Sequence, residues 1–217
     1  MENFIKTLIY IHAFFGGLGL IAGVISMLVR KGGKVHKLWG KIFSVGMITS
    51  SLLSLIVASF PGHENIFLFL IGIFTIYMVL AGNRALTLKV SIKSKADDLD
   101  KSISYIMFAI AVLMMIFGTI CLLKDNNLWT LYFFFGSIGL IMTYRDFKAF
   151  KEFTTNNKVA IISHIGRMVG AFITSVTAFI VAGLSISNLV VWLLPTFLGI
   201  PYIIFWTRKM KTVKFKL

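Results

Sequence analysis

The residues best placed to do chemistry inside an apolar surrounding are His164 and Arg167. They lie one helical turn apart within Lys158–Leu184, a stretch apolar enough to cross a membrane. Ionisable groups kept inside such a segment usually face neighbouring helices or water, and they often mark a functional site. The alternative is that this helix is longer than the membrane core, so that Arg167 extends to the lipid head groups.

Further candidates are expected on the same side of the membrane as this pair. The complete predicted ligand-binding set is His164, Arg167, Arg84, Arg145, His36 and Asp146. Because Asp146 is the only acid expected nearby, such a site favours an anionic or amphipathic ligand, such as a lipid head group or a quinone. The three arginines would act as charge partners and His164 as a hydrogen-bond donor.

The positions of the acids argue against several activities. No Asp or Glu lies in the middle of an apolar run, whereas proton- and sodium-coupled carriers commonly use a carboxylate there. The single cysteine, Cys121, excludes an internal disulfide and a cysteine-based metal site. We find no Ser elbow, P-loop, HExxH or dinucleotide-binding motif. We therefore expect a binding protein rather than an enzyme.

The four histidines support a second hypothesis, a b-type haem protein for electron transfer. His12 and His63 are expected at the outer membrane level, and His36 and His164 at the inner level. Paired imidazoles are the axial ligands that haem b needs. Against this, His63 lies in a short loop and His36 in the basic, Gly-rich stretch KGGKVHKLWG, so both are also consistent with solvated loop histidines.

The elements that must position these residues are transmembrane helices. Hydrophobic residues make up 58% of the 217 residues, above the usual share of about 45–50% in soluble domains. Seven apolar runs approach or exceed the roughly 20 residues that a membrane span needs. They are Phe4–Val29, Ile42–Phe60, Ile66–Leu88, Ser102–Leu123, Leu128–Tyr144, Val159–Leu184 and Leu189–Thr207. The prediction is one all-α integral membrane domain over residues 1–217, a bundle of seven helices.

The distribution of Lys and Arg predicts the orientation of this bundle. Most of the 22 basic residues fall in four segments, Arg30–Lys41, Arg84–Lys101, Arg145–Lys158 and the tail from Arg208, whereas the opposite side holds only Lys6 and Lys124. By the positive-inside rule, the N-terminus is outside, the C-terminus is cytoplasmic, and the basic loops are cytoplasmic. We predict a bacterial cytoplasmic (inner) membrane protein. The net charge of +14 is explained by these loops, so nucleic acid is not an expected partner.

Small residues recur on single helix faces, as they do where membrane helices pack closely. His12, Gly16, Gly19 and Gly23 form one such face, and Gly46, Ser50 and Ser54 form another. Such faces could serve the bundle itself or a homo-oligomer. A third function, a small-solute carrier or channel, would need a polar path. The hints for one are Asn83, Thr174, Ser175 and Thr177.

Three stretches resemble a family of bacterial predicted multi-spanning membrane proteins with no established activity. They are RKGGKVHKLWGKIF after the first apolar run, FLFLIGIFTIYMVLAGNRALTLK, and RDFKAF followed by HIGRMVGAFITSVTAF and WLLPTFLGIP. The resemblance implies seven spans and directs attention to His36, Arg84, Arg145, Asp146, His164 and Arg167.

Overall fold

The protein is a bundle of long helices. The computed structural model describes residues 2–88, 95–151, 157–186 and 188–212, and within these ranges it contains helices and turns but no strand. The helices are α1 Glu2–Leu28, α2 Lys34–Val57, α3 Ile66–Ala85, α4 Asp98–Leu123, α5 Trp129–Lys151, α6 Asn157–Ala178 and α7 Leu189–Thr212. A short π-helical turn, η1 Phe179–Gly183, continues α6. Helices are the expected form because lipid offers no partners for exposed backbone groups.

Six of these segments are long and apolar enough to cross a membrane, and α5 does not belong to the six. The last two turns of α5 carry Arg145, Asp146, Lys148 and Lys151, which lowers its hydropathy. The prediction of an all-helical, multi-pass membrane protein is confirmed in this form, whereas a seventh span through α5 stays a prediction.

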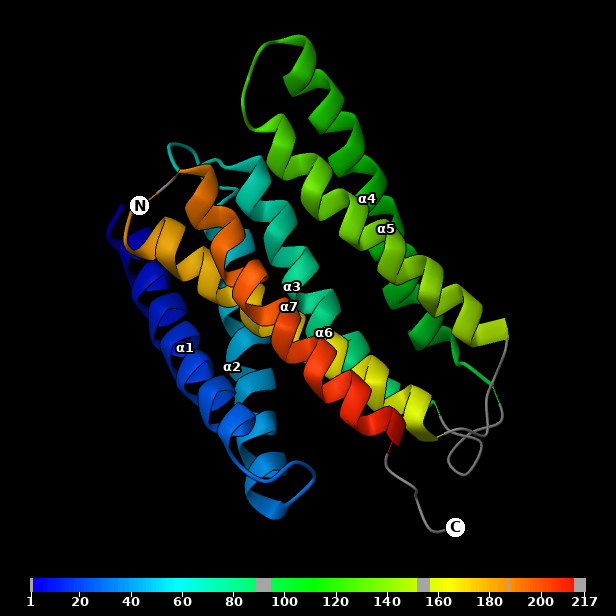
Figure 1. The fold of residues 1–217 in the computed structure, drawn as a ribbon. Helices are drawn as coiled ribbons and strands as arrows, with labels where there is room; N and C mark the ends of the chain where they lie inside the picture. The colour runs from blue at the N-terminus through cyan, green and yellow to red at the C-terminus, as the bar shows by residue number, and fades with distance from the viewer. Residues whose placement is uncertain (1, 89–94, 152–156, 187, 213–217) are drawn as a thin grey trace.

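The helices form two hairpins on either side of a central group (Figure 1). The α1–α2 hairpin lies on one side, the α4–α5 hairpin lies on the other, and α3, α6 and α7 lie between them. Helix α3 is the most buried of the candidate spans, and its Phe74 and Met78 are almost inaccessible to solvent. The core therefore centres on α3.

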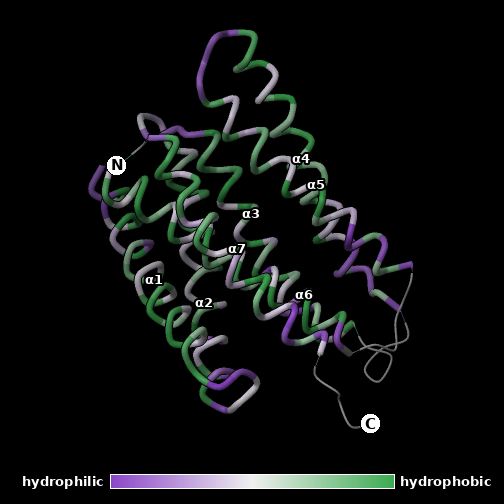
Figure 2. The backbone as a smooth tube through the Cα atoms, viewed as in Figure 1, coloured by the Kyte–Doolittle hydropathy of each residue, from purple (hydrophilic) through white to green (hydrophobic). Residues whose placement is uncertain are grey.

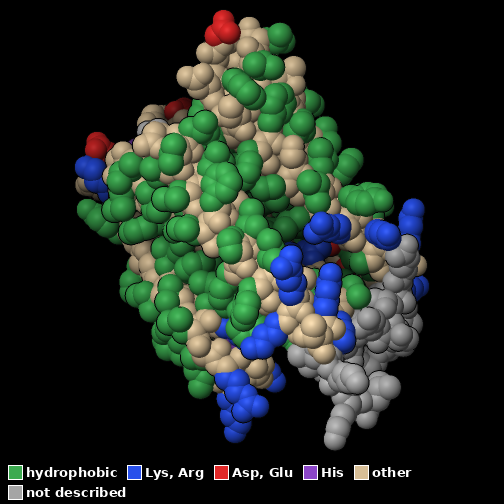
Figure 3. Space-filling model, in the orientation of Figure 1, with side chains coloured by type: hydrophobic (Ala, Val, Ile, Leu, Met, Phe, Trp, Pro, Cys, Tyr) green, Lys and Arg blue, Asp and Glu red, His purple; other side chains and the backbone are tan. Residues whose placement is uncertain are grey.

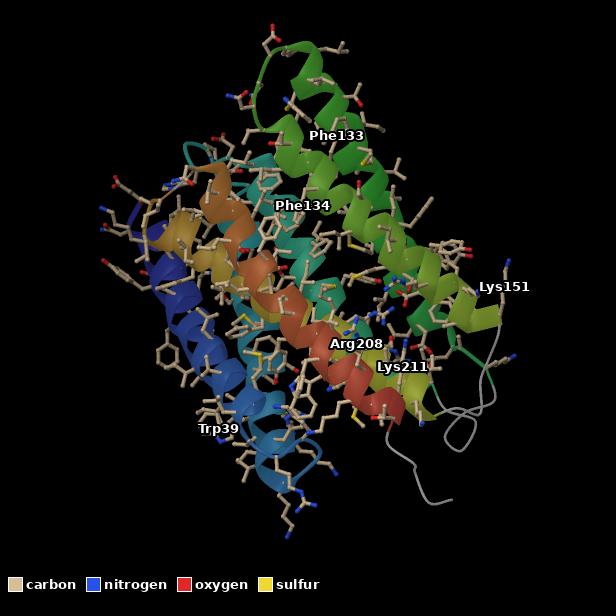
Figure 4. All side chains as sticks on the ribbon, in the orientation of Figure 1. Trp39, Phe133, Phe134, Lys151, Arg208 and Lys211 are labelled. Atoms are coloured by element: carbon tan, nitrogen blue, oxygen red, sulfur yellow. The ribbon has the colours of Figure 1, made fainter. Side chains whose placement is uncertain are left out.

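Apolar residues dominate the long middle sections of the helices, and hydrophilic residues gather near their ends (Figure 2). On the face shown in Figure 3, most Lys and Arg side chains cluster at one end of the bundle. Figure 4 places Arg208 and Lys211 on the last turns of α7 and Lys151 at the end of α5, all toward that same end. We call this the basic end.

Helices α1 and α2 pack closely because small residues face each other. A Cβ added to Gly46 would lie 2.9 Å from the carbonyl oxygen of Phe15 and 3.1 Å from the Cα of Gly19. Beside them, Ser50 Oγ donates a hydrogen bond of 3.0 Å to the carbonyl of His12. The predicted small-residue faces therefore serve contacts within the chain.

The start of α2 differs from the sequence prediction. We expected the second helix to begin at Ile42 and His36 to lie in a loop, but α2 begins at Lys34, directly after Gly33. The turn before it is formed at Gly32, whose φ of 76° is a conformation that glycine adopts without strain. The sequence Lys34–Lys41 contains no helix breaker before Gly40, so basic residues form the first turns and place His36 on a helix.

Candidate functional site

The turn between α1 and α2 places Lys31 at one end of a pocket. Its ammonium donates to the carbonyl of Ser26 at 3.0 Å and also to that of Met27, so it neutralises the carbonyl end of α1. The same ammonium lies 5.0 Å from the ring centre of Trp206 on α7, a cation–π contact. Partial burial lowers the pKa of Lys31 from its ordinary value. A cation is thus held in place between α1 and α7.

Two histidines line this pocket in the same manner. His36 Nδ1 lies 3.0 Å from the carbonyl of Ser26, and His164 Nδ1 lies 2.8 Å from the carbonyl of Gly82 on α3. A carbonyl can only accept, so each Nδ1 carries a proton and donates it. Each Nε2 has no protein partner among the described residues.

The pocket itself has a volume of about 590 Å³, well within the roughly 300–1,000 Å³ of typical ligand sites. Five helices line it: α1, α2, α3, α6 and α7. Its apolar wall consists of Met27, Phe43, Leu86, Ile161, Ile165, Met168, Val169, Phe172, Tyr202, Trp206 and Met210. Its ionisable lining is basic and consists of Lys31, His36, Lys37, Lys41 and His164.

No Asp or Glu of the described residues lines this pocket. Lys37 and Lys41 are exposed, and no carboxylate in the described ranges pairs with either. Ser26 Oγ, on the α1 wall, is buried and has no hydrogen-bond partner among those residues. The pocket therefore combines a long apolar wall with cations and unused hydrogen-bonding groups, which suits an amphipathic ligand that carries negative charge.

A second polar centre lies between α3, α4, α5 and α6. Asp146 Oδ2 accepts from Tyr77 Oη at 2.6 Å and from Ser104 Oγ at 2.9 Å, while Asp146 Oδ1 pairs with Arg167. Asp146 and Arg167 are 5% and 7% exposed. Arg167 also donates to Ser163, and its buried Nε has no partner within the described part of the chain. This centre joins the α4–α5 hairpin to the rest of the bundle.

A third group of charges lies at the start of α4. Arg84 Nε donates to Asp100 Oδ1 at 2.5 Å, and a second guanidinium nitrogen of Arg84 donates to Asp97 at 2.6 Å. Asp97 and Asp100 also form a capping box at the first turn of α4. A cavity of about 10 Å³ lies between Arg84, Asp100 and the Asp146–Arg167 pair, enough for about one water molecule.

The structure thus divides the predicted ligand-binding set. His36 and His164 meet in the large pocket. Arg84, Asp146 and Arg167 line the small cavity instead, where the two arginines are bound to carboxylates. Arg145 is exposed on α5 and lines neither.

Two sequence interpretations are corrected at Asp146. We expected no carboxylate in the middle of a span and used that absence against proton coupling, but Asp146, which lies just beyond the fifth apolar run, is buried among four helices. We also considered that Arg167 extends to the head groups, whereas it pairs with Asp146. The pair forms because α5 continues helically past Tyr144, where the apolar run ends, and so carries Asp146 into the core.

The remaining histidines do not join the pocket. His12 Nδ1 lies 2.8 Å from the carbonyl of Ser50, in the α1–α2 interface, and His63 is exposed in the turn before α3. No group of three or more His, Cys, Asp and Glu side chains in the described ranges could hold a metal ion. Of the four histidines, His36 and His164 line the large pocket, so the haem hypothesis now rests on this pair.

The polar residues suggested for a solute path form local bonds. Thr174, Ser175 and Thr177 each donate to the carbonyl four residues earlier in α6. Only Asn83 reaches another helix, through a 2.9 Å bond to Ser44 Oγ, and it lines the large pocket.

Sequence reasoning missed several residues of both polar centres. Lys31, Tyr202 and Trp206 line the pocket, and Tyr77 and Ser104 bind Asp146. A signal existed for Lys31, which directly follows the first apolar run, because a lysine at the end of a helix binds its last carbonyls. Tyr77 and Ser104 look like ordinary residues of apolar runs, and only their neighbours in space distinguish them.

Comparisons of the chain with protein-family models, with curated proteins and with solved structures find no match. The resemblance to a family of bacterial membrane proteins therefore stays a prediction, and the candidate site is argued from the chain's own geometry.

Proposed function

We propose that this protein binds an amphipathic, negatively charged small molecule in the large pocket. The observation that supports the proposal is the lining: an apolar wall from five helices, five basic or histidine side chains, and no acid among the described residues. A ligand with an apolar chain and a phosphate or other anionic head would match both parts. The ligand-binding residues are Lys31, His36, Lys37, Lys41 and His164. Arg84 and Arg167 are neutralised by carboxylates and hold the helices around the site.

In this proposal the protein is a binding protein of a bacterial cytoplasmic membrane. It has seven spans, with its N-terminus outside and its C-terminus and basic end in the cytoplasm, as the positive-inside rule predicts. Lys31, Lys37 and Lys41 would then meet the anionic inner leaflet, where each Lys contributes about 1 kcal/mol of attraction. A lipid would enter with its head toward these lysines and its chain along the apolar wall.

The proposal is tested by lipid retention in native mass spectrometry of the detergent-purified protein. Phosphatidic acid and phosphatidylcholine are offered at equal concentration, and we expect phosphatidic acid to be retained preferentially. At about 1 kcal/mol per lysine, the double variant Lys37→Gln/Lys41→Gln should lower its affinity roughly thirtyfold.

The matched control is Lys6→Gln/Lys124→Gln, which removes two exposed lysines away from the pocket and should change nothing. Equal retention of the two lipids by the unmodified protein would reject an anion-selective pocket. An equal loss of phosphatidic acid affinity in the two double variants would also reject it.

A second candidate is haem b, and one observation favours it. His36 and His164 line the same pocket, and each donates its Nδ1 proton to a backbone carbonyl, the arrangement common in metal-ligating histidines. The haem propionates would meet Lys31, Lys37 and Lys41. An absorption spectrum of protein expressed with ample haem decides this candidate: a Soret band that is lost in His36→Ala and His164→Ala supports it, and a protein-only spectrum rejects it.

A further inference from the structure

The hydrogen-bonding groups of the large pocket narrow the chemistry of its ligand. In the neutral rings of His36 and His164, the proton sits on Nδ1, because that atom donates to the Ser26 or Gly82 carbonyl. Nε2 of each ring is then an acceptor without a protein donor in the described part of the chain. A purely anionic head group offers acceptors only and would leave both atoms unpaired.

One further group extends this acceptor surface. Asn83 uses its amide nitrogen to donate to Ser44 Oγ, which leaves its amide oxygen as an acceptor. The lysines therefore favour a ligand with a negative charge, while the histidines and Asn83 favour a ligand that also carries hydrogen-bond donors.

We propose that the ligand is an anionic phospholipid whose head group carries free hydroxyls beyond its phosphate. The phosphate pairs with Lys31, Lys37 and Lys41, and the hydroxyls donate to Nε2 of His36 and His164. The acyl chains follow the apolar wall formed by residues such as Phe43, Met168 and Phe172. This inference rests on the proposed function and specifies its ligand class.

Other head groups satisfy only part of this lining. Phosphatidic acid supplies the charge but no hydroxyl donor beyond its phosphate. Phosphatidylethanolamine supplies N–H donors, but its ammonium would lie among three lysines with no acid of the described residues to balance it. Phosphatidylglycerol supplies both a phosphate charge and two head-group hydroxyls, and it is the probe of choice.

The test compares phosphatidylglycerol with phosphatidic acid, phosphatidylethanolamine and phosphatidylcholine in native mass spectrometry of the full chain. The variants are His36→Asn and His164→Asn, because Asn keeps an N–H donor in place of Nδ1 and removes the Nε2 acceptor. The control is His63→Asn in the exposed turn. Circular dichroism melts check that each variant is folded.

We expect the unmodified protein to retain phosphatidylglycerol best. Each pocket variant should lose roughly fivefold in phosphatidylglycerol affinity, the size of one neutral hydrogen bond, with phosphatidic acid unchanged. Equal retention of phosphatidylglycerol and phosphatidic acid by the unmodified protein overturns the inference and leaves the proposed function standing. Because this comparison of phosphatidylglycerol with phosphatidic acid uses the unmodified protein, it decides the inference even if a variant does not fold. If the unmodified protein retains neither phosphatidylglycerol nor phosphatidic acid better than phosphatidylcholine, both this inference and the proposed function are overturned.

A water-soluble molecule could offer the same phosphate and hydroxyls as the lipid head group. Glycerophosphoglycerol, which has the phosphate and hydroxyls without acyl chains, is added as a competitor at millimolar concentration. We expect it not to displace bound phosphatidylglycerol, since the apolar wall has no contact with it. Full displacement would overturn the assignment of a lipid and show that the pocket takes a water-soluble phosphate diester.

Discussion

Asp146 and Arg167 illustrate how two charges can be buried in an apolar bundle. Asp146 accepts from Tyr77, Ser104 and Arg167, so its carboxylate is hydrogen-bonded on both oxygens. Burial of ions is expensive, and a hydrogen-bonded partner offsets much of that cost. Removal of one partner therefore leaves the other as an uncompensated buried charge.

We predict that Asp146→Ala destabilises the protein by about 3–5 kcal/mol. The free energy of unfolding is measured by circular dichroism during denaturation in mixed detergent. Asp98→Ala is the control, because the Asp98 side chain is fully exposed and its ion pair with Lys101 is 3.7 Å long, so solvent screens the pair and it contributes little to stability.

The double variant Asp146→Leu/Arg167→Met separates the effect of an unpaired buried charge on stability from the effect of lost packing. Replacement of a whole buried ion pair by apolar residues is often neutral, so it should be clearly more stable than Asp146→Ala. If Asp146→Ala lowers the free energy of unfolding no more than Asp98→Ala does, the Asp146–Arg167 pair is not a buried structural contact.

At the scale of elements, the α1–α2 hairpin forms one wall of the pocket. Its two helices approach closely because Gly19 and Gly46 have no side chains at their contact. Helix α7 closes the pocket opposite, where Tyr202 Oη donates to the carbonyl of Met27 at 3.1 Å and Trp206 lies beside Lys31. α7 continues through Pro195 and Pro201 to reach this position.

We predict that Gly46→Ala destabilises the hairpin by about 1–3 kcal/mol, the usual cost of overpacking. The added methyl group would meet the backbone of α1 at Phe15 and Gly19, which has little freedom to move. Gly17→Ala on α1 is the matched control, because nothing lies within 4 Å of its added Cβ. It should be neutral, or more stable by up to about 1 kcal/mol, since Ala favours helix.

Unfolding free energies of the two variants, measured under one detergent condition, decide the comparison. Equal stability of Gly46→Ala and Gly17→Ala would mean that α1 and α2 do not pack through their glycines.

For the whole molecule, the gathering of Lys and Arg at one end (Figure 3) bears on its orientation. Lys34 lies in the first turn of α2 and Lys124 directly follows α4, and both are exposed. If the basic end is cytoplasmic, these two positions lie on opposite sides of the membrane.

We predict that a membrane-impermeant maleimide labels Lys124→Cys but not Lys34→Cys in intact cells. Both substitutions are made in a Cys121→Ser background, which removes the single native cysteine. Permeabilised cells should label both and serve as the accessibility control. The reverse pattern would place the basic end outside, and labelling of both positions in intact cells would contradict a membrane between them.

The amino-acid sequence by itself determined the helical, multi-pass architecture, because long apolar runs in lipid must satisfy their own backbone groups. It also singled out His36, His164, Arg167 and Asp146 as residues of interest. Its errors lie where apolar runs end. Hydropathy placed the end of the fifth run at Tyr144 and the start of the second at Ile42. Both helices continue through charged residues: Asp146 of α5 is paired in the core, and Lys34, Lys37 and Lys41 of α2 are exposed.

Only the tertiary structure decided which of these groups act together. Arg167 and Asp146 neutralise each other across two helices, which removes Arg167 from the expected anion site. His36 and His164 come together with Lys31 and Trp206 because α1, α2, α6 and α7 converge around one pocket. These contacts join residues that are far apart in the chain. Which of them pair depends on how the helices pack against each other, and local sequence patterns do not reveal that packing.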